Sequence, residues 1–327
     1  MSDSANPRYS LVIPVFNEEA VLPLLMYRLE ALLDELDAPA EVIFIDDGST
    51  DSSSIYLRAR AKNDVRFRYI GFSRNFGQQI AITAGLDAAR GDAVVVMDGD
   101  LQDPPEVTLD MIAKWREGYD IVYAKRIRRD EDSLFKRATA YIFYRFVNRL
   151  SSVPIPENVG DFRLLDRKVV DAFRSMPERS RFVRGMFAWL GFKQGFVEFD
   201  RPGRPAGATK YSMLRLLRLA VTYVISFSDL PLRMVVWCGC AVSAIALLYG
   251  LSAIYKKFTG GVHIEGWAST VVVLSFLCGA NMLMTGIIGL YIGRIYAEVK
   301  QRPLYIVDKR EGFSEAGQQS GRERDAA

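Results

Sequence analysis

Residues 93–103 read AVVVMDGDLQD, and this stretch largely determines the expected fold. A short run of small and β-branched apolar residues is typical of a buried strand, and carboxylates follow where it ends. Similar strand patterns alternate with amphipathic helix patterns on both sides of it. Such repeated β-α units predict an α/β fold with a Rossmann-like, mainly parallel sheet and helices on both faces. The expected strands are Tyr9–Val15, Glu41–Ile45, Phe67–Phe72, Ala93–Met97 and Ile121–Ala124, and the expected helices are Glu19–Leu36, Asp51–Asn63, Gln78–Ala89 and Pro105–Glu117.

Polar or small residues follow every one of these strands. In an open parallel sheet, ligands bind at the carboxyl ends of the strands, so residues from successive strands are expected to meet there. We therefore predict one polar crevice at this edge of the sheet. Its candidates are Pro14, Asn17 and Glu18; Asp46 and Asp47; Ser73, Arg74 and Asn75; Asp98, Gly99, Asp100 and Gln102; and Lys125 and Arg126.

Asp98 and Asp100 flank Gly99 directly after the most strand-like segment. Two carboxylates this close repel each other unless a cation lies between them, and hard oxygen ligands favour Mg²⁺ or Mn²⁺. Gly99 would let a diphosphate approach the backbone, and Gln102 would add a further oxygen. Such a metal neutralises the charge on a departing nucleoside diphosphate. An Asp-x-Asp pair is also common in ordinary loops, and its position at the end of the central strand is what favours the metal site.

Several other classes of site are excluded by residue type. The chain has one histidine, His263, and its three cysteines (Cys238, Cys240 and Cys278) all fall in apolar runs. A Ser-His-Asp or Cys-His mechanism, or a thiolate zinc site, is therefore not available to the first 200 residues. No G-x-G-x-x-G follows the first strand and no G-x-x-x-x-G-K-[ST] occurs, which disfavours dinucleotide dehydrogenases and P-loop NTPases. We expect no nucleic-acid partner.

Two runs without charged residues, Met234–Tyr255 and Gly266–Gly293, exceed the roughly 20 residues that cross a bilayer. They predict two membrane spans, at about 231–256 and 266–293, with buried core helices as the alternative. The polar N-terminus resembles no cleaved signal peptide. By the positive-inside rule both ends of this hairpin are expected in the cytoplasm, although Lys256 and Lys257 between the spans weaken the asymmetry. The flanking cations are Arg215, Arg218 and Arg233 before the first span and Arg294, Lys300 and Arg302 after the second.

Segments Ser133–Leu150 and Tyr211–Phe227 combine basic with aromatic and aliphatic residues. This mixture favours helices that lie in the membrane interface, with amphipathic core helices as the alternative. We expect a catalytic domain over 1–200, an acceptor loop and interfacial helix over 201–229, two transmembrane helices within 230–296 and a cytoplasmic tail over 297–327 with a disordered end. The Gly286–Gly289–Gly293 spacing offers a face for packing a second copy of the chain.

Six ordered runs resemble glycosyltransferase family two: VIPVFNEE, FIDDGSTD, FSRNFGQQIAITAGLDAARGD, VMDGDLQDPPE, NVGDFRLLDR and RPAGATKYS. The resemblance covers roughly Tyr9 to Val307. It extends to the polyprenyl-phosphate branch, which includes bactoprenol glucosyltransferase, dolichyl-phosphate mannose synthase and the undecaprenyl-phosphate aminoarabinose transferase. The Q-x-x-R-W signature of processive polysaccharide synthases is absent, since RFVRGMFAWLG does not fit it. One transfer per substrate is therefore expected.

The resemblance implies an A-type glycosyltransferase fold and an inverting mechanism. It assigns Pro14, Phe16 and Glu18, with Asp46 or Asp47, to the nucleoside pocket, and it places Asp161 where the family has its proposed base. Asp98 and Gly99 would contact the nucleotide-sugar. The set Asp98, Asp100 and Gln102 resembles the diphosphate-metal site, and the set Arg126, Arg137, Arg204 and Lys210 resembles the cations that bind the acceptor phosphate.

Elementary chemistry leaves the role of Asp161 open. The second pKa of a phosphate is about 6, so a lipid phosphate is already a nucleophile near pH 7. Asp161 need not remove a proton, and it could instead orient a sugar hydroxyl or hold Arg163 and Arg126 in place. A capping or salt-bridging aspartate is the structural alternative. For Arg204 and Lys210 the alternative is a basic loop that faces the membrane.

The predicted reaction is transfer of one sugar from a nucleotide-sugar to a polyprenyl phosphate, at the cytoplasmic face of a membrane and with the bacterial inner membrane favoured. UDP-glucose is the favoured donor. Mannose, N-acetylglucosamine or aminoarabinose as the sugar, or another lipid as the acceptor, are alternatives. A membrane-tethered nucleotide-binding or scaffold protein without activity is a further alternative, against which the intact Asp98, Asp100 and Asp161 argue.

Overall fold

The computed structural model describes residues 6–127, 159–179, 181–200, 230–259 and 266–313. Its internal contacts divide the chain into two compact units. The sheet unit holds β1 to β8 with the helices that cover the sheet. The helical unit holds the two long apolar helices α9 and α10. Each unit is described by itself. The predicted interfacial helices Ser133–Leu150 and Tyr211–Phe227 lie outside the described residues.

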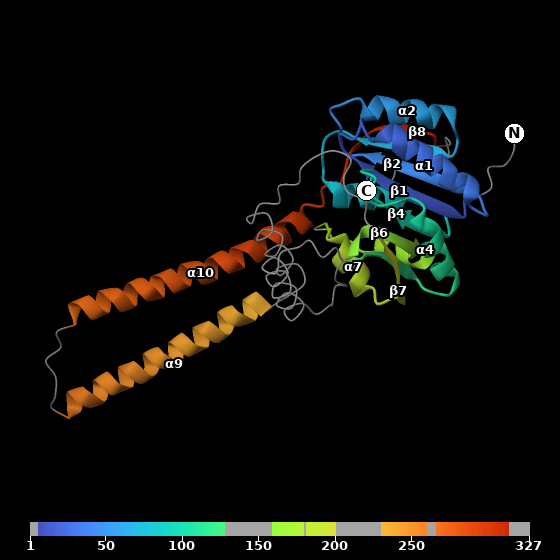
Figure 1. Ribbon diagram of the computed structural model, residues 1–327. Helices are drawn as coiled ribbons and strands as arrows, with labels where there is room; N and C mark the ends of the chain where they lie inside the picture. Colours follow the sequence, from blue (N-terminus) through green and yellow to red (C-terminus); the bar gives the residue numbers. More distant parts are fainter. Residues whose placement is uncertain (1–5, 128–158, 180, 201–229, 260–265, 314–327) are drawn as a thin grey trace. The chain divides into compact units, whose positions relative to one another are not determined.

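One eight-stranded sheet forms the centre of the sheet unit, in the order β7-β5-β6-β4-β1-β2-β3-β8 (Figure 1). The pairings β1-β2, β2-β3, β1-β4 and β5-β7 are parallel, as expected for a mainly parallel sheet. The pairings of β6 with β4 and β5, and of β8 with β3, are antiparallel. The sheet is therefore mixed. The strands are β1 Tyr9–Val15, β2 Ala40–Asp46, β3 Phe67–Phe72, β4 Ala93–Val96, β5 Ile121–Arg126, β6 Val159–Asp166, β7 Gln194–Phe199 and β8 Val307–Glu311.

Helices cover both faces of the sheet, as the alternating pattern predicts. Leu11 and Ile13 of β1 pack into a core with α1, α2 and α4, whereas Val12 contacts Gly85 of α3 on the other face. This alternation follows from the period of two in a strand. Helices α6 and α7 lie on the same face as α3. The helices are α1 Leu22–Glu35, α2 Ser53–Asn63, α3 Gln78–Ala88, α4 Val107–Arg116, α6 Arg167–Arg174 and α7 Val183–Trp189.

The strand order reverses at β1. From β1 the chain adds β2 and then β3 on one side, and α3 then carries it back across the other face to β4 on the opposite side of β1. The helices that connect β1 to β2 and β3 to β4 therefore cover opposite faces of the sheet, since α1 packs in the core with Leu11 and Ile13 whereas α3 packs against Val12. Such a switch point is where open α/β sheets bind ligands.

Strands β6, β7 and β8 are not among the predicted elements. Strand β6 carries Asp161 and Arg163, which occupy the same face two residues apart and neutralise each other. Strand β8 comes from the segment predicted as a separate cytoplasmic tail, and it pairs with the sheet edge instead. Its sequence VDKRE is polar because an edge strand is open to solvent on one side. Neither strand has the apolar alternation on which sequence patterns depend.

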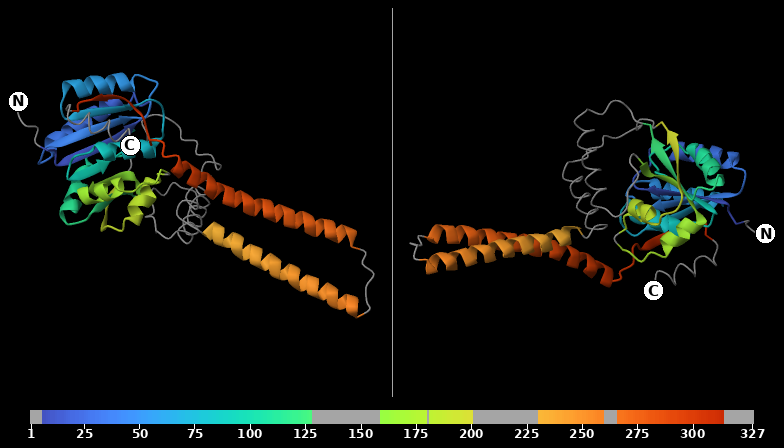
Figure 2. Two further views of the ribbon diagram at one scale, coloured as in Figure 1. Left: turned by 180° about the vertical axis from the view of Figure 1, so that it is seen from behind. Right: turned by 90° about the horizontal axis from the view of Figure 1, so that it is seen from below.

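The helical unit consists of α9 Leu230–Phe258 and α10 Trp267–Val299 (Figure 2). Within the described residues, one stretch is long and apolar enough to cross a membrane: Val272–Val299 of α10, with a mean hydropathy of 1.9 and none of its window buried. The corresponding stretch of α9, Met234–Tyr249, is shorter. Two helices therefore form where two spans are predicted, and the span predicted at 231–256, which corresponds to α9, remains a prediction. Large apolar side chains such as Trp237 and Phe276 are exposed on both helices, as expected for surfaces that lipid covers.

Candidate active site

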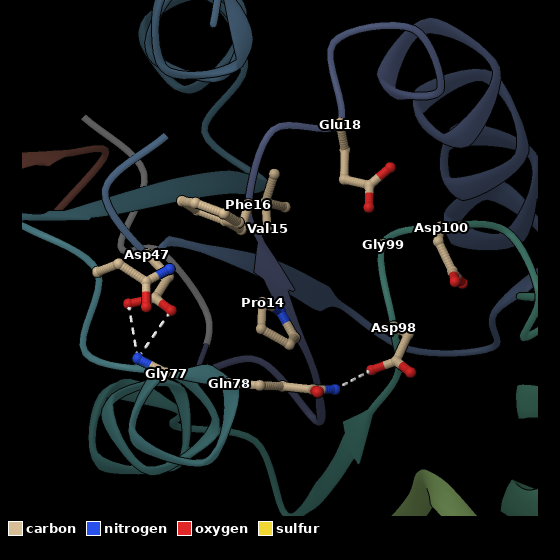
Figure 3. A pocket seen from close by; sticks show the side chains of 11 residues that line it. Pro14, Val15, Phe16, Glu18, Asp47, Gly77, Gln78, Asp98, Gly99 and Asp100 are labelled. Carbon is tan, nitrogen blue, oxygen red and sulfur yellow. Dashed lines mark hydrogen bonds between the residues drawn. The ribbon is translucent and has the colours of Figure 1, made fainter. Parts of the chain in front are cut away.

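A cavity of about 330 Å³ opens at the switch point, between the loops that follow β1 and β4. Its size falls in the usual range for small-molecule sites. The loop after β4 lies close to the loop after β1, since a Cβ added to Gly99 would lie 3.2 Å from the carbonyl oxygen of Pro14. Polar residues predicted at the ends of four strands line this cavity (Figure 3), whereas the predicted residues Asn17, Asp46, Ser73, Arg74 and Gln102 do not. The lining residues are Pro14, Val15, Phe16, Glu18, Asp47, Asn75, Gly77, Gln78, Asp98, Gly99 and Asp100.

The carboxylates of Glu18, Asp98 and Asp100 gather toward one end of this cavity, away from Asp47 (Figure 3). Burial, together with the negative charges of Asp103, Asp161 and Asp100, raises the pKa of Asp98 to about 8. Nε2 of Gln78 donates a hydrogen bond to Oδ1 of Asp98 at 2.7 Å. This end of the cavity has an excess of negative charge that a cation would relieve.

The donor set at Asp98 and Asp100 fits a divalent cation. Mg²⁺ is commonly held by one or two carboxylates together with substrate phosphates, rather than by a cage of protein ligands alone. The described residues contain no group of three or more His, Cys, Asp or Glu side chains placed to hold a metal ion by themselves. Gln102, the third predicted ligand, is buried and does not line the cavity. Its backbone N–H donates to Oδ1 of Asp100 at 3.1 Å.

The other end of the cavity is built around Asp47. Its carboxylate accepts backbone hydrogen bonds from Phe76 at 2.7 Å and from Gly77 at 2.9 Å. Burial raises the pKa of Asp47, against the lowering effect of these two bonds. Gly48 allows the loop after β2 to approach the loop after β3. It has a φ of +73°, and a Cβ there would lie 2.5 Å from the carbonyl carbon of Arg74. The aromatic ring of Phe16 is partly exposed beside this end (Figure 3).

Of the two adjacent aspartates Asp46 and Asp47, only Asp47 lines the cavity. Asp46 is buried beneath the loop. It accepts hydrogen bonds from the Tyr69 hydroxyl and from the backbone N–H of Ser49, each at 2.8 Å. Asp46 therefore supports the turn after β2, and Asp47 is the residue that can reach a ligand.

Asp161 belongs to a buried ion-pair network next to the cavity. Nη2 of Arg163 donates to its Oδ1 at 2.8 Å, and Arg184 of α7 donates Nε to Oδ1 at 2.9 Å and Nη2 to Oδ2 at 3.1 Å. Gln79 adds a long contact to Oδ2 at 3.4 Å. Burial alone would raise the pKa of Asp161, but the charges of Arg163 and Arg184 and the hydrogen bonds hold it below its usual value. The carboxylate is thus a stable anion clamped by two arginines.

The remaining predicted cations have different positions. Arg126 ends β5, and its guanidinium lies over the backbone of Gly160, one residue before Asp161. It does not line the cavity. Arg137, Arg204 and Lys210 lie outside the described residues. Lys125, the other polar residue after β5, forms an ion pair with Glu198 of β7.

The sequence reasoning missed Arg184, Gln78 and Gln79. The two glutamines are the first residues of α3. The side chain of Gln78 donates a hydrogen bond to Asp98, and that of Gln79 donates one to Asp161. Their position at a helix start after a polar strand end could have indicated them. Arg184 lies in RFVRGMFAWLG, which the sequence analysis used only to reject a processive signature. No local pattern there indicates a contact with Asp161, which is 23 residues away.

Comparison with known proteins agrees with this geometry. Residues 10–174 match the model of the family described as "Glycosyl transferase family 2". The chain is 46% identical to "Uncharacterized glycosyltransferase YkcC" of Bacillus subtilis (strain 168), over 95% of this chain and 96% of that protein. It is 43% identical to "Prophage bactoprenol glucosyl transferase homolog" of Escherichia coli (strain K12), over 92% of this chain and 99% of that protein.

The chain is also similar to a solved structure, described as "Mannosyltransferase PcManGT from Pyrobaculum calidifontis in complex with GDP-Man and Mn2+". The aligned region spans 91% of this chain and 87% of that one, with 16% identity and a TM-score of 0.40. The family match spans half of the chain, and the two curated relatives are similar over nearly their whole length. The chain belongs to glycosyl transferase family 2 and is a glycosyltransferase.

Proposed function

We propose that this protein transfers one sugar from a nucleotide-sugar to a polyprenyl phosphate, with inversion at the sugar carbon. One observation carries the proposal. A cavity with Asp98, Gly99 and Asp100 at its acidic end opens at the switch point, in a chain 43% identical over 92% of its length to a bactoprenol glucosyl transferase homolog. That similarity extends well beyond the sheet unit, which favours a shared lipid acceptor as well as a shared donor fold.

The cavity has two chemically different ends, and they suggest how a nucleotide-sugar lies in it. Asp47, Asn75 and Phe16 can recognise a base and ribose through hydrogen bonds and ring contact. Asp98 and Asp100 would hold Mg²⁺ or Mn²⁺ at the opposite end. Bound there, the cation would stabilise the negative charge on the departing nucleoside diphosphate. Gly99 lines the cavity without a side chain, which would leave space for the diphosphate to approach the backbone.

Asp161 acts in this proposal as a positioning residue. Its hydrogen bonds hold the guanidinium of Arg184, whose side chain is 39% exposed, while Arg163 is 1% exposed and fixes Asp161 from below. The acceptor phosphate supplies its own negative charge near pH 7, so the reaction needs no base. Asp161 and Arg184 would therefore orient the reacting groups beside Asp98, and Asp161 would remove no proton.

The acceptor phosphate would bind to cationic side chains near the membrane. Arg126 is the described candidate, and Arg137, Arg204 and Lys210 remain predicted ones. Guanidinium and ammonium groups suit this task because charge-assisted hydrogen bonds to phosphate are strong. Reversing the charge at Lys210 should raise the KM for the lipid and leave that for the donor unchanged. Equal damage to both constants would place this residue at the donor instead.

The two long helices would anchor the enzyme as a hairpin with the sheet unit in the cytoplasm. A lipid acceptor stays at headgroup level, so an anchored enzyme meets it without leaving the surface. Single cysteines at the exposed positions 65 and 308 should react from the same side, opposite His263→Cys, in a background without native cysteines. Labelling of position 263 from the cytoplasmic side would contradict the hairpin.

The reaction itself is tested with the full-length protein in detergent or vesicles. Candidate donors, with UDP-glucose first, are supplied with radiolabelled sugar, polyprenyl phosphate and Mg²⁺ or Mn²⁺. The expected result is a lipid-linked sugar together with release of the nucleoside diphosphate, both dependent on the acceptor. Transfer to no polyprenyl phosphate, with any of the nucleotide-sugars, would overturn the proposal. Release of nucleotide without a lipid product would indicate another acceptor.

A further inference from the structure

The chain returns to the sheet after α10, and the returning segment contacts the loop that forms one wall of the cavity. Strand β8 pairs antiparallel with β3, where Tyr69, Ile70, Gly71 and Phe72 face Glu311, Arg310, Lys309 and Val307. In Figure 1 this strand is red and lies among the blue strands from the beginning of the chain. Just before it, the backbone N–H of Ser73 donates to the carbonyl oxygen of Ile306 at 3.0 Å.

Tyr305, just before β8, makes the side-chain contacts of this segment with the end of β3 and with α3. Its ring stacks on Phe72 at the end of β3, with 5.1 Å between ring centroids and 20° between planes. Its hydroxyl donates to Oδ2 of Asp87 in the last turn of α3 at 3.2 Å. Tyr305 therefore joins the end of β3 to the far end of the helix that follows the loop 73–77.

The contacts continue from Tyr305 into the cavity wall. Phe72 packs edge-on against Phe76 with 5.6 Å between centroids, and the guanidinium carbon of Arg74 lies 3.9 Å from the centroid of the Phe76 ring. The backbone N–H groups of Phe76 and Gly77 donate to Asp47. Asp47, Gly77 and the neighbouring Asn75 line the cavity at its end away from Asp98 and Asp100.

From these contacts we propose that Tyr305 is a positioning residue for the donor site, which makes the segment after α10 a working part of the catalytic unit. The inference rests on the proposed function, because it identifies this end of the cavity with the nucleoside. It assigns the predicted tail a role in donor binding. Along the chain, only residues 300–304 separate Tyr305 from the end of α10, which is also the end of the candidate membrane span.

The selectivity of the effect follows from the geometry. Loss of the Tyr305 ring removes the stacking partner of Phe72 and loosens the loop 73–77, while the carboxylates of Asp98 and Asp100 lie on a different loop. One aromatic pair contributes enough to change an equilibrium by about tenfold. We therefore expect Tyr305→Ala to raise the KM for the nucleotide-sugar about tenfold and to leave the KM for the polyprenyl phosphate unchanged.

Matched variants separate this role from a general loss of structure. Tyr305→Phe keeps the ring and loses the hydroxyl that donates to Asp87, so its donor KM should lie between those of wild type and Tyr305→Ala. Tyr305→Leu keeps an apolar side chain for folding but not the stacking, and serves if Tyr305→Ala does not fold. Lys309→Ala changes β8 at an exposed residue whose described ion pair is with Asp308, and should match wild type.

The deciding measurement is calorimetric binding of UDP to the full-length protein in the absence of acceptor, alongside both KM values. Weaker UDP binding by Tyr305→Ala and Tyr305→Leu, with partial recovery in Tyr305→Phe, is the expected result. Wild-type affinity in all three variants, or an equal rise in donor and acceptor KM, would overturn the inference. Failure of the wild-type protein to bind any nucleoside diphosphate would instead contradict the proposed function, so the two failures are distinguishable.

Discussion

Asp98 directly follows β4, and Asp161 lies on the neighbouring strand β6. Both carboxyl groups are largely shielded from water, but the charges that surround them are of opposite sign. Asp98 is near Asp100, Asp103 and Asp161, and burial with these charges raises its pKa to about 8. Asp161 is paired with Arg163 and Arg184, and the pKa of its carboxyl is held low despite its burial. One carboxylate lacks sufficient positive charge from its own chain, whereas the other is neutralised by arginines.

Because the charges around them differ, Asp98 and Asp161 are suited to different tasks although both are aspartates. A buried anion among other anions is unfavourable unless a ligand brings positive charge, so Asp98 is suited to bind a cation. A buried anion with both oxygens in ion pairs is a poor proton acceptor, because protonation would leave two arginines without their partner. We therefore propose metal binding for the Asp98 end and positioning for Asp161. The predictions below test that division.

The largest effect is expected for Asp100→Ala. Removing a carboxylate that helps to hold the cation leaves the departing diphosphate unstabilised, and losses of this kind reach about 10³-fold or more in turnover. The measurement is the rate of lipid-linked sugar formation at saturating Mn²⁺, with circular dichroism to verify folding. Asp110→Ala, on the exposed side of α4, is the matched control and should keep full activity. Full turnover by wild type in excess chelator would contradict the assignment.

The next effect is on stability. Asp161→Asn breaks a buried pair and leaves Arg163 uncompensated, which costs about 3–5 kcal/mol in the free energy of unfolding. Because the pKa of Asp161 is lowered in the folded state, its contribution is present above the unfolded value of about 3.9 and is lost as pH falls through the folded value. Wild type should therefore lose stability on acidification more steeply than the variant. Chemical denaturation at pH 7 and pH 3.5 would reveal this, and parallel losses would show that the network does not stabilise the fold.

A smaller effect concerns the rate of the same variant. Misplacing Arg184 should slow transfer about 10²-fold, the loss that a displacement of about 1 Å can cause. The pH profile of the rate should keep its acidic limb near pH 6, where the acceptor phosphate ionises. A limb that disappears in Asp161→Asn would identify Asp161 as the titrating base. Rates should be corrected for the folded fraction measured by thermal unfolding.

The smallest effect has the opposite sign. Asp98→Asn replaces a carboxyl whose ionised form is unfavourable without a cation, so the variant without added metal should have a Tm equal to or slightly above that of wild type. Added Mn²⁺ together with UDP should raise the Tm of wild type more than UDP alone does, and this extra rise should be absent in the variant. Thermal scans with UDP, with and without Mn²⁺, measure both. A marked fall in Tm on substitution would mean that Asp98 is a structural aspartate like Asp161.

Sequence patterns predicted most of the residues that line the cavity. The β-α alternation up to Arg126 predicted five strands and four helices close to their observed bounds, because each buried strand is a short apolar run ended by a polar turn. The residues after β1, β2, β3 and β4 were expected to converge because parallel strands end at the same edge, and they do line one cavity. Local patterns and a topological rule were enough here.

The other half of the site depends on contacts that no local pattern encodes. Arg184 reaches Asp161 from another element, and Arg163 is buried only because Asp161 neutralises it. Strand β8 is polar and is held by pairing with β3, so its residues resemble a solvent-exposed tail. Asp46 and Asp47 are adjacent and chemically identical, and only the turn at Gly48 decides which of them faces the cavity.

The division of labour between the two aspartates is tested most directly by calorimetry of UDP binding with and without Mn²⁺. Three proteins suffice: wild type, Asp100→Ala and Asp161→Asn, each in its full-length form. We predict that Mn²⁺ strengthens UDP binding by wild type and by Asp161→Asn, and that Asp100→Ala loses this strengthening. Retention of the Mn²⁺ effect in Asp100→Ala, together with its loss in Asp161→Asn, would contradict the account.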